Sequence, residues 1–216
     1  MPIQVSAFRW VPPFAQGYVR DLRVRWALEE AGLPYAAVLI DPQIQASADY
    51  RHWQPFGQVP AFRDGEVELF ESGAIVLHLA EKSPALAPTD AAGRARVTTW
   101  VIAALNSLEP HVQNFAALDV FHAGEAWTEG YRPVARAMLE KKLNGLAGWL
   151  DGKDYLEGRF TAGDLIMSDV LRILERSDVL ERFPALDAYR RRCLARPAFG
   201  RALEAQLQAF REHAPA

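Results

Sequence analysis

The N-terminal third of the chain alternates short apolar runs with one amphipathic stretch, which is the pattern of a small α/β domain. Ile3–Phe8 alternates apolar and polar residues and predicts a first strand. A helix is predicted over 21–30, because Gly32 is a typical helix-ending residue and Pro34 cannot continue the helix. The apolar run Tyr35–Ile40 predicts a second strand that is buried.

The next segments predict a hairpin and a closing helix. Residues 60–62 and Val67–Phe70 flank Asp64-Gly65, a strong turn signal between two strands. Ser72–Lys82 is predicted to be helical, and residues 11–17 form a loop because they contain two prolines and a glycine. With a short helix before the hairpin, the order β-α-β-(short helix)-β-β-α is that of a thioredoxin-like domain.

The remainder of the chain is helical in pattern. Residues 83–93 are rich in Pro and Ala, so they predict a linker between a domain over 1–82 and a helical domain over 94–216. Pro110 is expected to kink or break the first of these helices. The predicted helices are 94–117, 130 or 133 to 150, 162 to beyond 174, 185–195 and 197–211. The predicted fold class is an α/β thioredoxin-like N-terminal domain followed by an all-α C-terminal domain.

The composition narrows the class of protein. The 216 residues are 50% hydrophobic with a formal net charge of −3, which gives no broad attraction for nucleic acid or an anionic membrane. The N-terminus has no basic segment followed by an apolar run, and no apolar stretch is long enough to span a membrane. Cys193 is the single cysteine, which fits a reducing cytoplasm and rules out an internal disulfide.

Two motifs predict a site for a small peptide. Val59-Pro60 stands at a strand entrance, and its bond is a good candidate for cis. A cis bond turns the Val59 N–H and C=O outward, where an extended peptide can pair with them. Glu71-Ser72 opens a helix, where free amides and the helix dipole attract a carboxylate. Together the motifs predict a site for a short, zwitterionic, thiol-bearing peptide.

These motifs, with others along the chain, resemble the soluble glutathione S-transferases. The matching segments are 23–35, 54–62, 70–75, 159–164 and 196–199, so the resemblance covers nearly the whole chain. It implies a cytoplasmic homodimer that uses glutathione as co-substrate, needs no metal and serves detoxification. Glutathione would lie on the N-terminal domain, and a hydrophobic electrophile would lie against the helical domain.

The resemblance leaves the thiolate-stabilising residue open. Such a residue must place a hydrogen-bond donor or a positive charge near the sulfur, which lowers the pKa of the thiol. Aligned on Arg23, the serine used by several classes falls on Tyr18 and the cysteine used by others falls on Arg20. Tyr18 is the first candidate, because a phenol can donate to a thiolate. Arg20 is the second, and a solvated or Asp21-paired arginine is its structural alternative.

The glutathione contacts follow from the resemblance. Ser72 is expected to bind the γ-glutamyl carboxylate and Glu71 the γ-glutamyl ammonium, while Ser72 also suits a plain helix cap. Gln58 is expected to contact the peptide from the side, and Val59-Pro60 is expected to pair with its backbone.

One departure from the family pattern concerns the glycine carboxylate. Many relatives hold it with a Lys or His, but residues 44–46 of this chain contain no cation. Gln45 is the candidate replacement, with Arg51 or His52 as alternatives.

The second substrate is expected against the first long helix after the linker. Trp100, Ala104 and Ser107 fall on one face of that helix, and Trp10 is placed to close over the site. Residues with this spacing also suit a protein core.

Other polar groups are expected to be structural. No metal site is predicted, because no helical ligand pair is formed by Asn106, Glu109, His111 and His122. Cys193 is predicted to be a buried thiol and no nucleophile.

Thr161 and Asp164 have the spacing of a capping box. Replacing Asp164 is expected to destabilise the fold by about 1 kcal/mol or more.

The leading prediction is a glutathione transferase that conjugates glutathione to an electrophile or reduces it. A glutathione-dependent reductase or dehalogenase is disfavoured, because no cysteine stands at the first-helix entrance. A non-catalytic glutathione-binding or dimerising module is the other alternative. Phe56 is a candidate knob into the partner subunit of a homodimer, or else an inward-facing phenylalanine.

Overall fold

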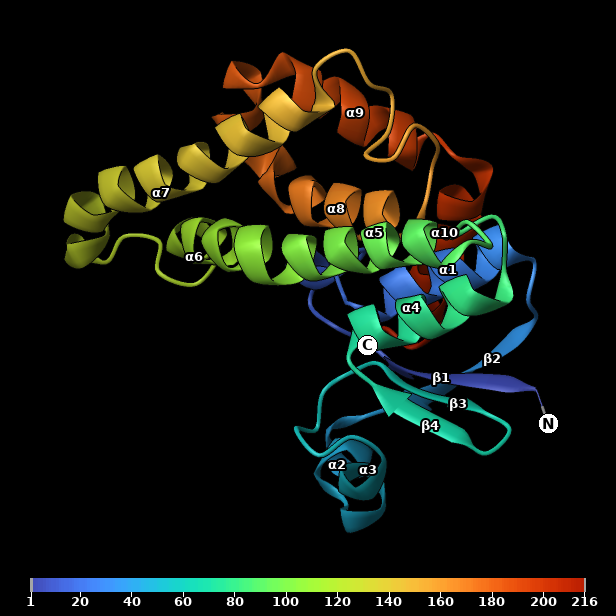
Figure 1. The fold of residues 1–216 in the computed structure, drawn as a ribbon. Helices are drawn as coiled ribbons and strands as arrows, with labels where there is room; N and C mark the ends of the chain where they lie inside the picture. The colour runs from blue at the N-terminus through green and yellow to red at the C-terminus, as the bar shows by residue number, and fades with distance from the viewer. Residues whose placement is uncertain (1, 216) are drawn as a thin grey trace. The chain divides into compact units, whose positions relative to one another are not determined.

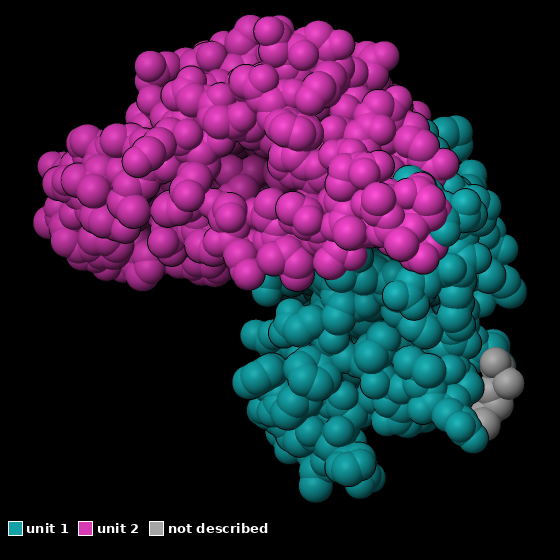
Figure 2. Space-filling model, viewed as in Figure 1, with its two compact units in different colours: residues 1–89, 196–216 teal, residues 90–195 magenta. Residues whose placement is uncertain are grey.

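The structure is a computed structural model that describes residues 2–215 (Figure 1). Its contacts divide the chain into two compact units, Met1–Thr89 with Arg196–Ala216, and Asp90–Ala195 (Figure 2). The sequence predicts a helical domain over 94–216, whereas these contacts group the last helix with the N-terminal unit. It stays a prediction that the predicted limits separate parts of the chain that fold independently.

The N-terminal unit is built on a four-stranded sheet of order β2-β1-β3-β4. Its strands are β1 (Ile3–Phe8), β2 (Tyr35–Ile40), β3 (Ala61–Asp64) and β4 (Val67–Phe70). β1 and β2 are parallel, with Ile3 opposite Tyr35, and the other pairs are antiparallel. This mixed sheet and its helices form the predicted thioredoxin-like fold.

Strand β2 is less buried than predicted. Ala36 and Ala37 are exposed and only Ile40 is fully buried. The reason is the strand order, since β2 lies at the edge of the sheet and, among the strands that the structure describes, pairs with β1 alone. The prediction that the whole strand is buried, made from its apolar run alone, was therefore wrong.

Helices cover the sheet on both sides (Figure 1). They are α1 (Asp21–Ala31), α2 (Pro42–Ala46), α3 (Ala48–Trp53), α4 (Ser72–Lys82) and α10 (Pro197–Glu212), and a 3₁₀ turn spans Pro13–Ala15. Gly32 ends α1 with a φ of 66°, as predicted. Helices α4 and α10 both pack against α1. The single short helix predicted before the hairpin is in fact two helices, α2 and α3.

The second unit is helical. Its helices are α5 (Ala91–Ile102), α6 (Glu109–Val120), α7 (Ala126–Leu150), α8 (Ala162–Arg172) and α9 (Pro184–Leu194), and 3₁₀ turns span Ile173–Arg176 and Val179–Arg182. Helices α5 and α6 are joined by a π-helical turn, Ala103–Leu108, which lies just before Pro110. The predicted disruption near Pro110 is therefore present. Helix α7 contains Pro133 in its interior, so its predicted start at 130 or 133 was too late.

The predicted capping box begins α8. Thr161 and Asp164 make both of its reciprocal hydrogen bonds. Asp164 is fully buried and also accepts hydrogen bonds from the Leu156 N–H at 2.9 Å and the Tyr189 hydroxyl at 3.0 Å. It therefore joins α8 and α9 to the loop before α8. Within residues 2–215, no helix combines the length and the apolar character needed to cross a membrane.

Candidate functional site

Val59-Pro60 forms a turn just before β3, which we call the Val59 corner. The Val59-Pro60 bond is cis, as predicted. On one side of the corner, the Ala61 N–H donates to the Ser6 Oγ at 2.6 Å. Among the residues the structure describes, the Val59 N–H and C=O have no hydrogen-bond partner. These two groups are therefore free to pair with an added extended peptide.

The loop that leads into this corner is held by buried polar side chains. The Tyr50 hydroxyl bonds to the Ser6 Oγ at 2.8 Å and donates to the Gln58 carbonyl at 2.6 Å. The buried Gln54 Oε1 accepts from the N–H groups of Phe56 at 2.8 Å and Gln58 at 3.2 Å. Sequence reasoning missed Ser6, Tyr50 and Gln54, although a polar residue between apolar neighbours in β1 was a signal for the first.

The residues proposed for the glycine carboxylate lie beside the same loop. The Gln45 Nε2 donates to the Gly57 carbonyl at 2.6 Å, so in this structure Gln45 holds the loop. The Arg51 guanidinium lies against Gly57, which has a φ of 63°, so a side chain at position 57 would displace it. Arg51 and His52 are both exposed on α3. Their roles toward a glycine carboxylate stay predictions.

Helix α4 begins on a strained residue. Glu71 has a φ of 70°, which a residue with a side chain rarely adopts and which costs about 1–3 kcal/mol. The first N–H groups of the helix, from Ser72 to Ala74, have no acceptor within the helix. Backbone strain of this kind is concentrated at functional sites, where the surroundings fix it. The start of α4 therefore offers free amides and a helix dipole, the features to which anions bind at helix N-termini.

The Ser72 side chain is contacted by a buried arginine. Its Oγ accepts from the Arg23 Nη1 at 3.4 Å, and both residues are buried. Arg23 lies on α1, and its contact with Ser72 was not predicted from the sequence. A charged residue on a helix whose residues 21–28 are all buried was the available signal. Arg23 orients the Ser72 hydroxyl and adds positive charge to the start of α4.

The entrance of α1 lies close to the Val59 corner. Val19, between Tyr18 and Arg20, packs against the apolar cluster that contains Val59 and Tyr50. The Tyr18 N–H donates to the carbonyl of Ala15 at 3.0 Å, and Arg20 is exposed. The structure thus brings the segment with both candidate thiolate stabilisers next to the peptide edge.

Asp21 is held by residues other than Arg20. Its carboxylate accepts from the Arg25 Nε at 2.7 Å and from the Gln206 Nε2 at 2.6 Å. Burial raises the pKa of Asp21, and the hydrogen bonds from Arg25 and Gln206 oppose that rise. The main side-chain partners of Asp21 are therefore Arg25 and Gln206 and not Arg20.

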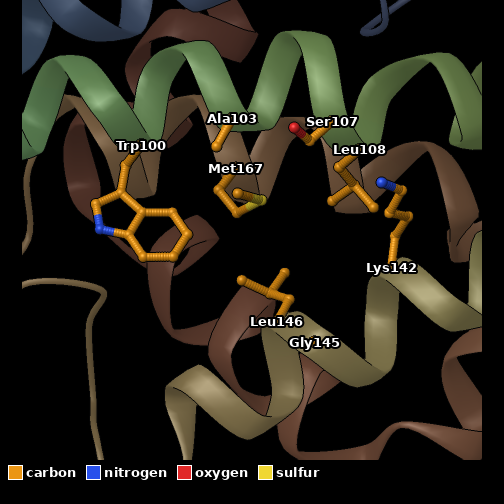
Figure 3. A pocket seen from close by; sticks show the side chains of 8 residues that line it. All are labelled: Trp100, Ala103, Ser107, Leu108, Lys142, Gly145, Leu146 and Met167. Carbon is orange, nitrogen blue, oxygen red and sulfur yellow. The ribbon is translucent and has the colours of Figure 1, made fainter.

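The predicted second-substrate residues are only partly brought together. A pocket of about 140 Å³ in the helical unit is lined by Trp100, Ala103, Ser107, Leu108, Lys142, Gly145, Leu146 and Met167 (Figure 3). Ala104 is fully buried and does not line it, and Trp10 is half-buried in the other unit. Figure 3 shows the Lys142 and Ser107 side chains at one end of the pocket and the Trp100 indole at the other.

Cys193, the single cysteine of the chain, is buried in the helical unit. Burial raises the pKa of the Cys193 thiol to about 12, so the thiol is protonated at neutral pH. Across the part of the chain that the structure describes, no group of three or more His, Cys, Asp or Glu could hold a metal ion.

Known proteins resemble this chain along most of its length. The family models that match are the glutathione S-transferase N-terminal domain, over residues 15–81, and the C-terminal domain, over residues 121–197. Glutathione S-transferase GstA of Escherichia coli O157:H7 is 30% identical over 188 residues, covering 83% of this chain and 90% of that protein. A glutathione S-transferase of Hyoscyamus muticus is 29% identical over 195 residues, covering 85% and 92%. A crystal structure of a Pseudomonas fluorescens glutathione transferase family member, with two glutathione bound, matches with a TM-score of 0.80 at 25% identity, covering 94% and 92%.

Proposed function

This chain belongs to the glutathione S-transferase family, and we propose that it binds glutathione at the Val59 corner and the start of α4. The observation that carries this proposal is the unpaired Val59 backbone, which lies in one unit with the strained, amide-rich start of α4. The cysteinyl backbone of glutathione pairs with Val59 as an added strand. The γ-glutamyl carboxylate accepts from the Ser72 hydroxyl and the first amides of α4, and Glu71 meets the γ-glutamyl ammonium.

The proposed reaction is transfer of the glutathione sulfur to a hydrophobic electrophile. The bound thiol gives its proton to water, and the thiolate sulfur forms a bond to an electrophilic carbon as the leaving group departs with its electron pair. A donor at the α1 entrance lowers the pKa of the thiol by stabilising the thiolate. Tyr18 is the first candidate and Arg20 the second. Gln58 contacts the peptide from the side.

The proposal is tested by titrating glutathione into the protein in a calorimeter and then measuring conjugation and peroxide reduction with a panel of electrophiles. Saturable binding with turnover on at least one electrophile is expected. Binding without any turnover would favour a non-catalytic glutathione-binding module. No binding at all would overturn the proposal.

We further propose that the protein is a cytoplasmic homodimer in which Phe56 packs into the partner. The Phe56 side chain is 63% exposed, and its ring contacts the exposed Phe70 at a centroid distance of 6.0 Å. A large exposed aromatic is the residue type that dominates interface energies.

Phe56→Ser is expected to weaken the dimer about 100-fold or more, measured by light scattering across a dilution series. Ile44→Ser, another exposed apolar position of the same unit, is the control and leaves the dimer intact. A Phe56→Ser protein as dimeric as the wild type would contradict this role.

The pocket of the helical unit is the proposed site for an apolar part of the electrophile. A cavity of about 140 Å³ suits a single ring, since a dry apolar cavity of about 150 Å³ binds benzene. Gly145 lines it, and a Cβ there would meet no atom within 4 Å. Gly145→Leu is therefore expected to fill the pocket, raising the electrophile KM about 10-fold with unchanged glutathione affinity.

The control for this substitution is Gly148→Leu, on the same helix and equally open but outside the pocket. Both variants are expected to gain about 0.8 kcal/mol of stability from helix propensity. An unchanged electrophile KM in Gly145→Leu would contradict the substrate role. Loss of the dimer in that variant would instead indicate that the pocket accepts a side chain of a second copy.

A further inference from the structure

Gln206 reaches from the C-terminal helix to the entrance of α1. It lies on α10 and is 1% exposed. Its Nε2 donates to the Val19 carbonyl at 3.1 Å and to the Asp21 Oδ1 at 2.6 Å. The Gln206 amide therefore binds Val19 and Asp21, which are the two neighbours of Arg20, and Val19 directly follows Tyr18.

Both Asp21, which accepts from this amide, and helix α10, which carries it, are fixed by other contacts. The second oxygen of Asp21 is held by Arg25, whose guanidinium also lies 5.9 Å from the centre of the Tyr35 ring. Helix α10 is fixed to α1 by the Arg196–Glu30 ion pair at 2.6 Å, and by further contacts, the Arg201–Glu29 ion pair and the Trp26–Phe199 ring pair. The position of Gln206 is therefore set by contacts other than its own hydrogen bonds.

A glutamine suits this position chemically. Its amide nitrogen has two hydrogens and can serve both acceptors at once. A glutamate would place a second carboxylate beside the buried Asp21 and would donate nothing when ionised.

The Gln206 Oε1 is buried without a hydrogen-bond partner among the described residues, as is the Arg25 Nη2. A buried unpaired acceptor is costly, and an apolar side chain would avoid that cost. An apolar side chain would, however, remove the donor to the buried Asp21 Oδ1. The donation from Nε2 to the α1 entrance is therefore the feature that needs a glutamine.

We propose that Gln206 is a positioning residue for the thiolate-stabilising group, acting through Val19 and Asp21 on Tyr18 and Arg20. This inference rests on the proposed glutathione transferase function. The segment it holds also packs through Val19 against the cluster that contains Val59, and the Gln206 amide adds a polar contact from α10. A donor displaced by about 1 Å can cost about 100-fold in rate.

The test measures the thiol pKa of bound glutathione, by thiolate absorbance at saturating glutathione, in wild type and Gln206→Met. The variant keeps the length of the side chain and removes the donor. The bound thiol pKa is expected to rise by about 1 unit and kcat to fall about 10-fold, with a smaller change in glutathione KM. Gln208→Met is the control and leaves the thiol pKa unchanged, because the Gln208 side chain, on the same helix, donates to Glu212 and, among the described residues, to nothing at the α1 entrance.

A double-mutant cycle separates positioning from general destabilisation. If Gln206 acts through the segment, Gln206→Met has no further effect on the thiol pKa once Tyr18→Phe and Arg20→Met are both present. If the thiol pKa is lowered in the wild type and has the same value in folded Gln206→Met, this inference is overturned and the proposed function stands. Additive effects also overturn it. A wild-type complex whose thiol pKa is not lowered overturns the function and this inference together.

Discussion

Asp164→Ala is expected to lower the free energy of unfolding by about 3–5 kcal/mol. The carboxylate is fully buried and accepts from the N–H and Oγ of Thr161, the Leu156 N–H and the Tyr189 hydroxyl, at 2.9–3.0 Å. Alanine leaves these donors unpaired in the interior, and each such group costs about 1–3 kcal/mol unless water enters. The structure therefore raises the expected loss above that of a helix cap alone.

Chemical denaturation of wild type and Asp164→Ala measures this loss. Asp154→Ala is the matched control, because Asp154 is exposed and pairs with Arg192 on the surface. That change is expected to cost less than about 0.5 kcal/mol. A loss of about 1 kcal/mol in Asp164→Ala would mean that the cap is the whole role of the residue.

Ser72→Ala is expected to weaken glutathione binding about 10- to 100-fold, because a hydrogen bond to a charged group contributes about 1.5–3 kcal/mol. The hydroxyl lies at the start of α4, oriented by Arg23, where the γ-glutamyl carboxylate is proposed to bind. Calorimetric titration measures the change, with thermal unfolding to check that the variant is folded. Ser83→Ala, a buried serine at the other end of α4, is the control and keeps wild-type affinity. An affinity of Ser72→Ala within about twofold of wild type would remove Ser72 from the site.

Local signals account for the parts of the fold that were predicted well. Gly32 ends α1 in the left-handed conformation, and the Asp64-Gly65 turn joins β3 and β4. The capping box of Thr161 and Asp164 begins α8 as its spacing requires. Each of these depends on residues a few positions apart, so the sequence carries the whole signal.

Nonlocal packing accounts for what was missed. The burial of Tyr35–Ile40 depends on strand order, and its apolar residues gave no sign that it is an edge strand. The start of α7 before Pro133 shows that one missing N–H does not prevent a helix that packs well elsewhere.

The same limit applies to the candidate site. Val59 and Ser72 were predicted as site residues from motifs, but the side chains that support them were not predicted. Arg23 meets Ser72 across 49 positions of the chain, and Gln206 meets Asp21 across 185. No spacing rule reaches over such distances. The positioning of the site is therefore a property of the folded chain.

The most direct test of the central claim, that this protein binds glutathione as a thiolate, is an absorbance titration of the thiolate in the wild-type complex. The free thiol titrates near pH 8.5, about the pKa of an unperturbed cysteine. Bound at the Val59 corner beside the α1 entrance, it is expected to titrate at least about one unit lower. A saturated complex in which the thiol still titrates near its free value would contradict the account.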